Sequence, residues 1–306
     1  MKILIAGITG NIGSHAAAHA LSLGHSVHGL GRNPSKLPAA TSSALESFIQ
    51  STSYYDTAAL DRAAAGVDAV ICAYAGLPEL HLDAQLLLLR ASERAGVKRF
   101  LAAGWNYDWR VLGLGDEPVY DAAMMFHQQA ALTSGIRPCH VFSGMLADVF
   151  FGVGGQRGFT PRDGGVWDPE GLRMEVWGSG EEEWNFTTEE DAGRWGVEVV
   201  VADGAEEGGF VRVCSWTASL REVKEAVERV KGVKVGWEVK GSLEELQDMA
   251  EEGRKLGLRR FWEWHRHVFM ENCVSGRWNL KKLENGRFPN VRPTSLEEFI
   301  RDALPG

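Results

Sequence analysis

The sequence predicts an α/β protein built on a doubly wound parallel sheet. Three observations lead to this prediction. An apolar run at residues 2–6 leads into a glycine-spaced turn and then into a segment with helical periodicity. Short apolar runs then alternate with amphipathic segments as far as about residue 142. The chain of 306 residues, 44% hydrophobic and 24% charged, is long enough to bury a large core.

The first turn has the spacing of a dinucleotide-binding loop. Its first glycine permits a tight turn, its second lets a phosphate approach the backbone, and its third lets the helix pack closely on the strand. Apolar residues recur at helical spacing from Asn11 to Leu23, and Gly24 ends the helix. Free N–H groups and the helix dipole then meet at one spot. We therefore expect a dinucleotide to contact Gly7, Thr9, Gly10, Asn11, Ile12 and Gly13. The alternative is a glycine-rich turn with an empty helix N-terminus.

The end of the second strand, at 26–30, indicates which dinucleotide is bound. In NAD-binding sites an acidic residue about 20 residues after the glycines holds the ribose 2′-hydroxyl. Here Arg32 lies 19 residues after Gly13, and Lys36 follows one turn later. A cationic pair attracts a 2′-phosphate, so the sequence favours NADP(H) over NAD(H). The alternative is a solvated basic loop.

The elements that follow continue the alternation of strands and helices. Strands are expected at 48–51, 68–73, 98–103 and 139–142, and helices at 57–65, 78–95 and 119–134. This rhythm indicates right-handed βαβ units and a parallel sheet. Ligands of such sheets lie at the carboxyl ends of the strands. We therefore expect Tyr74, Ala75 and Gly104 to contact the cofactor as well.

The pattern changes beyond about residue 150. Short strands are expected near 174–176, 184–186 and 211–214, separated by glycine-rich turns. Three serine capping boxes mark helix starts, at Ser219, Ser242 and Ser295, each with a glutamate three residues later. The aromatic stretch 259–272 would line a pocket or, as is commoner, pack in a core. We expect residues 1–150 to form the dinucleotide-binding domain and 151–306 a smaller α+β substrate lobe, with some elements crossing between them.

Composition excludes several classes of partner. The net charge of −9 and the lack of a basic stretch argue against nucleic acid. No apolar run reaches the 18 residues of a membrane span, and the first strand begins at residue 2, which leaves no room for a leader. Four scattered cysteines fit a reduced, cytoplasmic protein, and no set of residues has metal-ligand spacing. Small hydrophobic or aromatic molecules are the expected partners, and a homodimer is left open.

Motifs along almost the whole chain point to one known family. They are the glycine turn, Arg-Asn-Pro-Ser-Lys at 32–36, Ala-Gly-Val-Lys-Arg-Phe at 95–100, Phe-Thr-Thr-Glu-Glu-Asp-Ala-Gly at 186–193 and Pro-Thr-Ser-Leu-Glu-Glu-Phe at 293–299. Together they resemble the isoflavone-reductase-like and NmrA-like atypical short-chain dehydrogenases. The resemblance implies an NADP(H)-binding Rossmann domain and a small C-terminal substrate domain. Many members reduce phenolic or polyketide-derived metabolites, and others are redox-sensing regulators that bind the dinucleotide without turnover.

The active-site residues depart from the pattern of that family. Its reductases use a Tyr-x-x-x-Lys pair, or a lysine on the same helix, whose charge lowers the pKa of a hydroxyl and fixes the nicotinamide ribose. The aligned stretch here runs from Tyr120 to Met124, and no lysine occurs between Lys98 and Lys224. Met124 is placed where the cofactor would lie but offers neither charge nor proton. The serine common at the end of the fifth strand is also replaced, by the stretch 102–104.

Three functions remain open. The first is an NADPH-dependent reductase of an aromatic or polyketide-type metabolite, in which Tyr120 or His127 donates the proton and Asn106 or Tyr107 polarises the substrate oxygen. The second is a non-redox isomerase, dehydratase or cyclase on the same scaffold. The third is a catalytically silent sensor of NADP(H). Aromatic residues at the strand ends, among them Trp105, favour a pocket for a flat ligand, which a sensor does not need.

Overall fold

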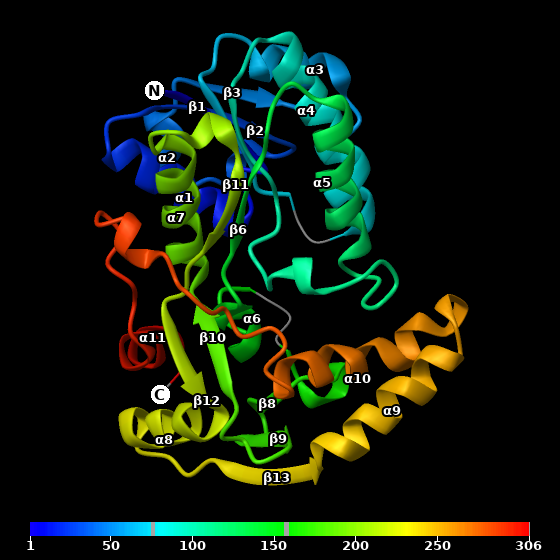
Figure 1. Cartoon of the computed structure of the whole chain (residues 1–306). Helices are drawn as coiled ribbons and strands as arrows, with labels where there is room; N and C mark the ends of the chain where they lie inside the picture. The colour runs from blue at the N-terminus through cyan, green and yellow to red at the C-terminus, as the bar shows by residue number, and fades with distance from the viewer. Residues whose placement is uncertain (75–76, 156–158, 306) are drawn as a thin grey trace.

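The computed structural model describes residues 1–74, 77–155 and 159–305. A seven-stranded sheet forms the upper half of the molecule in Figure 1, in the order β11-β6-β5-β4-β1-β2-β3, and every neighbouring pair is parallel. Its strands are β1 (Lys2–Ala6), β2 (Ser26–Gly31), β3 (Ser47–Gln50), β4 (Ala69–Cys72), β5 (Arg99–Leu101), β6 (Cys139–Phe142) and β11 (Gly209–Arg212). Because β1 lies between β2 and β4, the strand order reverses there, as the predicted doubly wound fold requires.

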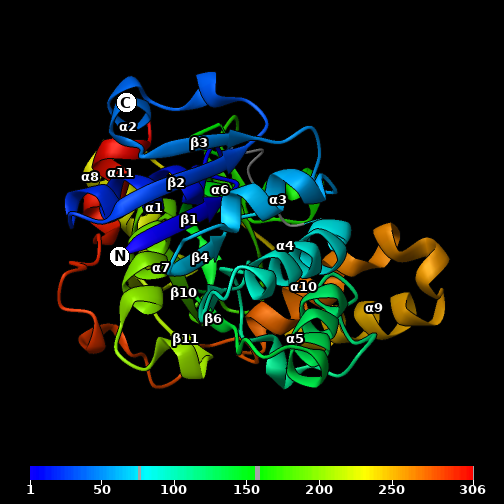
Figure 2. The ribbon, with the colours of Figure 1, turned by 90° about the horizontal axis from the view of Figure 1, so that it is seen from above.

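Alternating side chains of β1 explain why helices cover both faces of the sheet. Ile3 and Ile5 belong to a core shared with α1 (Asn11–Ser22) and α7 (Glu189–Val201). The intervening Leu4 and Ala6 point the other way, into the core under α3 (Thr57–Ala64), α4 (Gln85–Arg94) and α5 (Asp121–Thr133). Figure 2 shows these two groups of helices on opposite sides of the strands. Burial on both faces accounts for the continuous apolar run in the sequence.

The second lobe occupies the lower half of Figure 1 and has its own core. One small sheet contains β7 (Met145–Leu146), β10 (Glu183–Thr187) and β12 (Trp216–Ser219), and another contains β8 (Trp167–Asp168), β9 (Arg173–Trp177) and β13 (Gly236–Gly241). The helices of this lobe are α8 (Leu220–Lys231), α9 (Leu243–Lys255), α10 (Phe261–Val274) and α11 (Leu296–Ala303). Two short helices, α2 (Ala39–Ala44) and α6 (Ala147–Phe151), and single turns complete the structure. The three predicted capping boxes are confirmed at the starts of α8, α9 and α11.

Elements from the second half of the chain return to the first lobe. The strand expected at 211–214 is β11, which extends the main sheet by pairing with β6. Helix α7 packs against α1, and a Cβ atom at Gly193 would lie 2.7 Å from the backbone nitrogen of Ala16. Only glycine permits so close an approach of the two helices. Two elements beyond residue 150, α7 and β11, therefore pack on elements that precede it.

The helix expected at 78–95 is not regular. It begins with a π-helical segment, η2 (Leu80–Ala84), and continues as α4. The fully buried side chain of Gln85 stabilises this irregular turn: its Nε2 donates to the carbonyl of His81 at 2.9 Å, and its Oε1 accepts from the N–H of Ala103 at 2.6 Å. Segments of this kind occur often at functional sites. This one ties the end of β5 to the helix beside it.

Within the described ranges, no helix is long and apolar enough to cross a membrane, and no group of three or more His, Cys, Asp or Glu side chains could hold a metal ion. All four cysteines (Cys72, Cys139, Cys214 and Cys273) are buried and unpaired.

Candidate functional site

The glycine turn is shaped for close backbone contacts. Gly7 has a φ of 81°, and a Cβ atom there would lie 2.5 Å from the carbonyl oxygen of Ala73. A Cβ atom at Gly13 would lie 2.3 Å from the carbonyl oxygen of Gly7. Gly10 is the N-cap of α1 and supplies no side-chain cap, so the first N–H groups of the helix are left for an anion. This arrangement fits the phosphates of a dinucleotide.

Gly13→Ala is expected to lower stability by about 1–3 kcal/mol and to weaken NADPH binding, because the new methyl group would push α1 away from the turn. Urea unfolding and calorimetric titration measure the two effects. Gly135→Ala is the matched control, since a Cβ atom at that position meets nothing within 4 Å. Equal stability of the two variants would contradict this role of Gly13.

Two positive charges lie beside the turn, at the end of β2. Gly31 adjoins Thr9, because a Cβ atom on Gly31 would lie 3.5 Å from Thr9 Oγ1. The next residue, Arg32, holds its guanidinium 5.0 Å above the ring of Tyr54. Arg32 and Lys36 are exposed, and neither has an ion pair with any residue that the structure describes. Such unpaired cations fit the 2′-phosphate that distinguishes NADP(H) from NAD(H).

A cavity of about 480 Å³ extends from the glycine turn to the second lobe. Its walls are largely aromatic and apolar, with a few polar side chains, as is usual for small-molecule sites. The lining residues are Gly10, Asn11, Ile12, Ala73, Tyr74, His81, Gly104, Trp105, Asn106, Trp109, Val119, Tyr120, Ala123, Leu146, Val149, Glu189 and Phe269. They include seven of the predicted site residues: Gly10, Asn11, Ile12, Tyr74, Gly104, Asn106 and Tyr120.

Tyr120 is the hydroxyl-bearing side chain at the end of the cavity nearest α5. Its ring packs edge-on against Trp278, with 5.4 Å between the ring centroids. Burial, together with the charge of Glu117, raises the pKa of Tyr120 well above its usual value. Tyr120 is therefore a neutral phenol at physiological pH, which can donate a proton or a hydrogen bond but is a poor base.

Asn106 is held by its backbone at the end of β5. Its carbonyl oxygen accepts from the N–H groups of Ser143 at 2.8 Å and Gly144 at 3.2 Å. Its side-chain Oδ1 accepts from the N–H of Tyr107 at 2.9 Å. The amide NH₂ group has no hydrogen-bond acceptor in the portion of the chain that the structure covers. That group is the donor that Asn106 offers to the cavity.

The other predicted site residues that the structure describes are not among those lining the cavity. Tyr107 is buried with its ring stacked 4.5 Å from Trp278, and its hydroxyl accepts from the Cys273 thiol at 3.4 Å. His127 faces β6 and β11 from α5: its Nδ1 is 3.2 Å from His140 Nε2, and its ring packs against Phe210. Met124 packs in the core of the second lobe and is not among the residues that line the cavity. The predicted contact at Ala75 lies outside the described residues.

Ten of the lining residues were not predicted as site residues from the sequence, and three of these come from elements that the prediction did not connect with the site. The ring of His81 faces the cavity from η2, and burial lowers its pKa, so its imidazole is neutral. Glu189 accepts from Asn11 Nδ2 at 2.7 Å and joins α7 to the glycine turn. Phe269 comes from α10. Glu189 lies in the motif at 186–193 and Phe269 in the aromatic stretch, so both had a sequence signal, whereas His81 had none because the periodicity predicted a regular helix.

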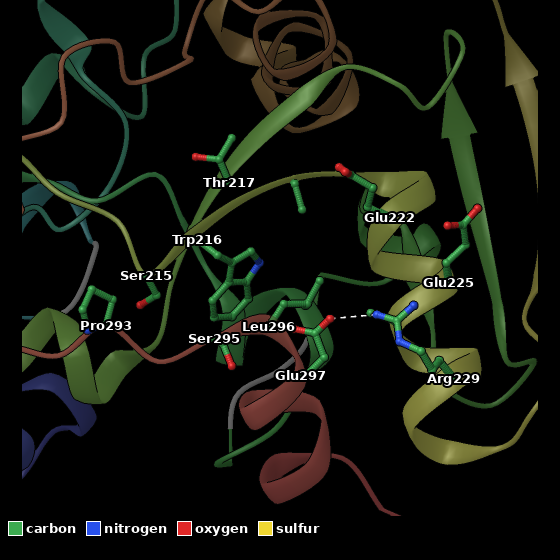
Figure 3. A pocket seen from close by; sticks show the side chains of 12 residues that line it. Ser215, Trp216, Thr217, Glu222, Glu225, Arg229, Pro293, Ser295, Leu296 and Glu297 are labelled. Carbon is green, nitrogen blue, oxygen red and sulfur yellow. Dashed lines mark hydrogen bonds and ion pairs between the residues drawn. The ribbon is translucent and has the colours of Figure 1, made fainter.

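A second hollow, of about 500 Å³, lies in the other lobe. Figure 3 shows side chains of β12, α8 and α11 around it, with the Arg229–Glu297 ion pair at 2.7 Å. Its polar groups are largely engaged in the structure, since Glu222 and Ser295 each belong to a capping box. None of the predicted site residues lines it. The cavity at the glycine turn is therefore the candidate site.

Comparison with known proteins agrees with this choice. Residues 7–123 match a family model described as NAD(P)H-binding. The chain is 26% identical to bifunctional pinoresinol-lariciresinol reductase 2 of Linum usitatissimum over 325 aligned positions, which cover 98% of this chain and 92% of the relative. AtPrR2, solved with NADP⁺ and (+)-pinoresinol, superposes with a TM-score of 0.74 at 18% identity, covering 98% of this chain and 97% of that one. The leucoanthocyanidin reductase–NADPH complex of Vitis vinifera gives 0.73 at 18% identity, covering 99% of both chains.

These matches establish the class of protein: the chain carries an NAD(P)H-binding domain with a Rossmann-type fold. The expected nicotinamide cofactor is thereby confirmed. The resemblance to isoflavone-reductase-like proteins, inferred from five motifs, is confirmed as well, because the sequence match and the structural matches both extend over nearly the whole chain.

Proposed function

We propose that this protein is an NADPH-dependent reductase of a flat aromatic or polyketide-type metabolite. The observation that carries the proposal is one continuous cavity, which joins the glycine turn to an aromatic chamber ending at Tyr120. A solved relative in fold, AtPrR2, contains NADP⁺ and (+)-pinoresinol together. The cavity here has room for a nicotinamide ring and part of a ligand of comparable character.

Different residues around the cavity would bind the cofactor, donate the proton and orient the substrate. The turn at 7–13 would hold the pyrophosphate, and Arg32 and Lys36 the 2′-phosphate. When bound, NADPH supplies a hydride. Tyr120 donates its hydroxyl proton to the substrate oxygen, and the amide of Asn106 donates a hydrogen bond that polarises the same oxygen. The aromatic walls exclude water and orient a flat substrate.

Calorimetric titration with NADPH, NADP⁺ and NADH, followed by a screen of aromatic carbonyls and enones with deuterated NADPH, tests the proposal. We expect NADPH to bind at least about tenfold more tightly than NADH, and deuterium to appear in the product. Failure of all three nucleotides to bind would overturn it. Turnover of a substrate without consumption of NADPH would instead establish a non-redox enzyme.

Arg32→Ala is expected to weaken NADPH binding by about ten- to a hundredfold and to leave NADH binding unchanged, because a charge-assisted hydrogen bond to phosphate is lost. The same titration measures both constants. Lys98→Ala is the matched control, because the exposed Lys98 immediately precedes β5. It therefore lies at the amino-terminal end of the strands, whereas the ligand site lies at their carboxyl ends. An equal loss of affinity for both nucleotides would show that Arg32 does not read the 2′-phosphate.

A sensor of NADP(H) is the second candidate. The observation that favours it is Met124, a buried apolar side chain on the helix where the resemblance implies a lysine. A sensor would bind NADPH and NADP⁺ with different affinities and transfer no deuterium to any substrate. The titration and the screen therefore separate the two candidates.

A further inference from the structure

Glu117 is a buried acid that forms no salt bridge with any residue that the structure describes. Its side chain is fully buried, and neither carboxyl oxygen has a hydrogen-bond partner in the described part of the protein. An ionised carboxylate in such a place would cost several kcal/mol, so the group is neutral unless something pairs with it. A buried unpaired polar group in a native structure calls for an explanation. Neither the fold nor the reductase chemistry described above uses this one.

The position of Glu117 relates it to Tyr120. The two residues form one turn before α5, in which the Tyr120 N–H donates to the carbonyl oxygen of Glu117 at 2.9 Å. The segment between β5 and α5 lies over α10 in Figure 1, where the Cys273 thiol bonds to Tyr107. Once ionised, the Glu117 carboxylate acts on both Tyr120 and Cys273 and raises the pKa of each. Glu117 thus belongs to the same buried group of side chains as the phenol that lines the cavity.

The charged groups around Glu117 come from three helices. Arg254 of α9 and the nearby backbone N–H of Val119 favour its ionised form, while Asp121 of α5 and Glu271 of α10 oppose it. Arg254 is itself paired with Glu271 at 3.1 Å, which weakens its effect. Burial is the largest influence and raises the pKa of Glu117 to about 8. The carboxyl therefore holds a proton at neutral pH that it can release.

We propose that Glu117 is the proton reservoir of Tyr120 and replaces the lysine that α5 lacks, an inference that rests on the proposed reductase function. In each turnover the substrate carbon gains a hydride and its oxygen gains one proton. Tyr120 gives that proton, and its O–H bond breaks. The O–H bond of Glu117 then breaks, and its proton passes through water to the phenolate oxygen, because neither carboxyl oxygen is hydrogen-bonded to the Tyr120 hydroxyl in the described structure. The Glu117 carboxylate regains a proton from solvent on the side of the partly exposed Arg254–Glu271 pair.

Glu117→Gln tests the reservoir, because glutamine keeps the shape and the neutrality of the protonated acid but has no proton to give. We expect kcat to fall at least about tenfold with KM and NADPH affinity unchanged. The wild-type kcat should decline as pH rises through about 8, and the variant should lack this decline. In a Tyr120→Phe background, Glu117→Gln should have no further effect, since it acts through that hydroxyl. An unchanged kcat or an additive double variant would overturn the proposal.

Infrared spectroscopy supplies a measurement that needs no substrate. The wild type at pH 7 should show the band of a protonated carboxyl that fades as pH rises through about 8 and is missing in Glu117→Gln. Lack of such a band would refute the proposed role of Glu117 as a proton reservoir, even if the protein reduces a substrate. Lack of hydride transfer in the wild type overturns the reductase and the reservoir with it, while the band still records whether Glu117 holds a proton.

Discussion

Tyr120→Phe is expected to lower kcat of the proposed reductase by about 10²–10⁴-fold, with little change in NADPH affinity. The variant removes one oxygen atom and keeps the ring that packs against Trp278. Loss of the proton donor leaves hydride transfer without charge neutralisation at the substrate oxygen, and the polarising amide of Asn106 does not compensate. Steady-state kinetics with the substrate found in the screen, at saturating NADPH, measure the effect.

The matched control for this variant is Tyr55→Phe, because the Tyr55 side chain is 53% exposed and lies outside the cavity. Its kcat should equal that of the wild type. A Tyr120→Phe variant with wild-type kcat would show that another group donates the proton. His81 would then be tested as the donor, since its neutral imidazole lines the same cavity.

Glu117→Gln is expected to make the protein more stable than the wild type at alkaline pH. Folding raises the pKa of Glu117 from 4.5 to about 8, so between these values the folded state holds a proton that the unfolded state has lost. Linkage then makes the wild type lose stability as pH rises from about 4.5 to 8, by at most roughly 5 kcal/mol in total. Glutamine does not titrate, so the variant escapes this loss.

The difference in free energy of unfolding should be near zero at pH 4 and should reach a few kcal/mol at pH 9, on the order of 5–10 °C in melting temperature. Thermal unfolding of both proteins across that range measures it. Glu207→Gln is the control: Glu207 is exposed and is not among the groups that act on Glu117, so its removal should bring no alkaline gain. Parallel pH profiles for Glu117→Gln and the wild type would show that Glu117 is ionised in the folded protein.

Local signals were enough to predict the sheet and the glycine turn. The strands are buried on both faces, which requires apolar runs in the sequence. Gly7 and Gly13 stand where a Cβ atom would clash, which requires the glycine spacing. The place of β11 could not be predicted in this way. Its pairing with β6 joins residues about 70 positions apart, and no local pattern specifies the partner of a strand.

The candidate site was only partly predictable for geometric reasons. Tyr120 and His127 lie seven residues apart on one side of a helix, but seven residues span about 10 Å, which carries His127 away from the cavity. Asn106 and Tyr107 are neighbours whose side chains diverge, and the bridge from Asn106 to Phe142 decides which one meets the cavity. Such a bridge depends on tertiary packing, so periodicity does not reveal it.

The return of α7 and β11 to the first lobe bears on how this chain can be divided. A fragment ending at residue 150 would contain the turn and six of the seven strands, yet it would leave Ala16, Ala17 and Ala20 of α1 without the helix that covers them. It would also leave β6 as an open edge. We therefore expect that residues 1–150 do not fold on their own. Attempts to express the nucleotide-binding half alone, or to exchange it between relatives, should keep the segment 189–212 with it.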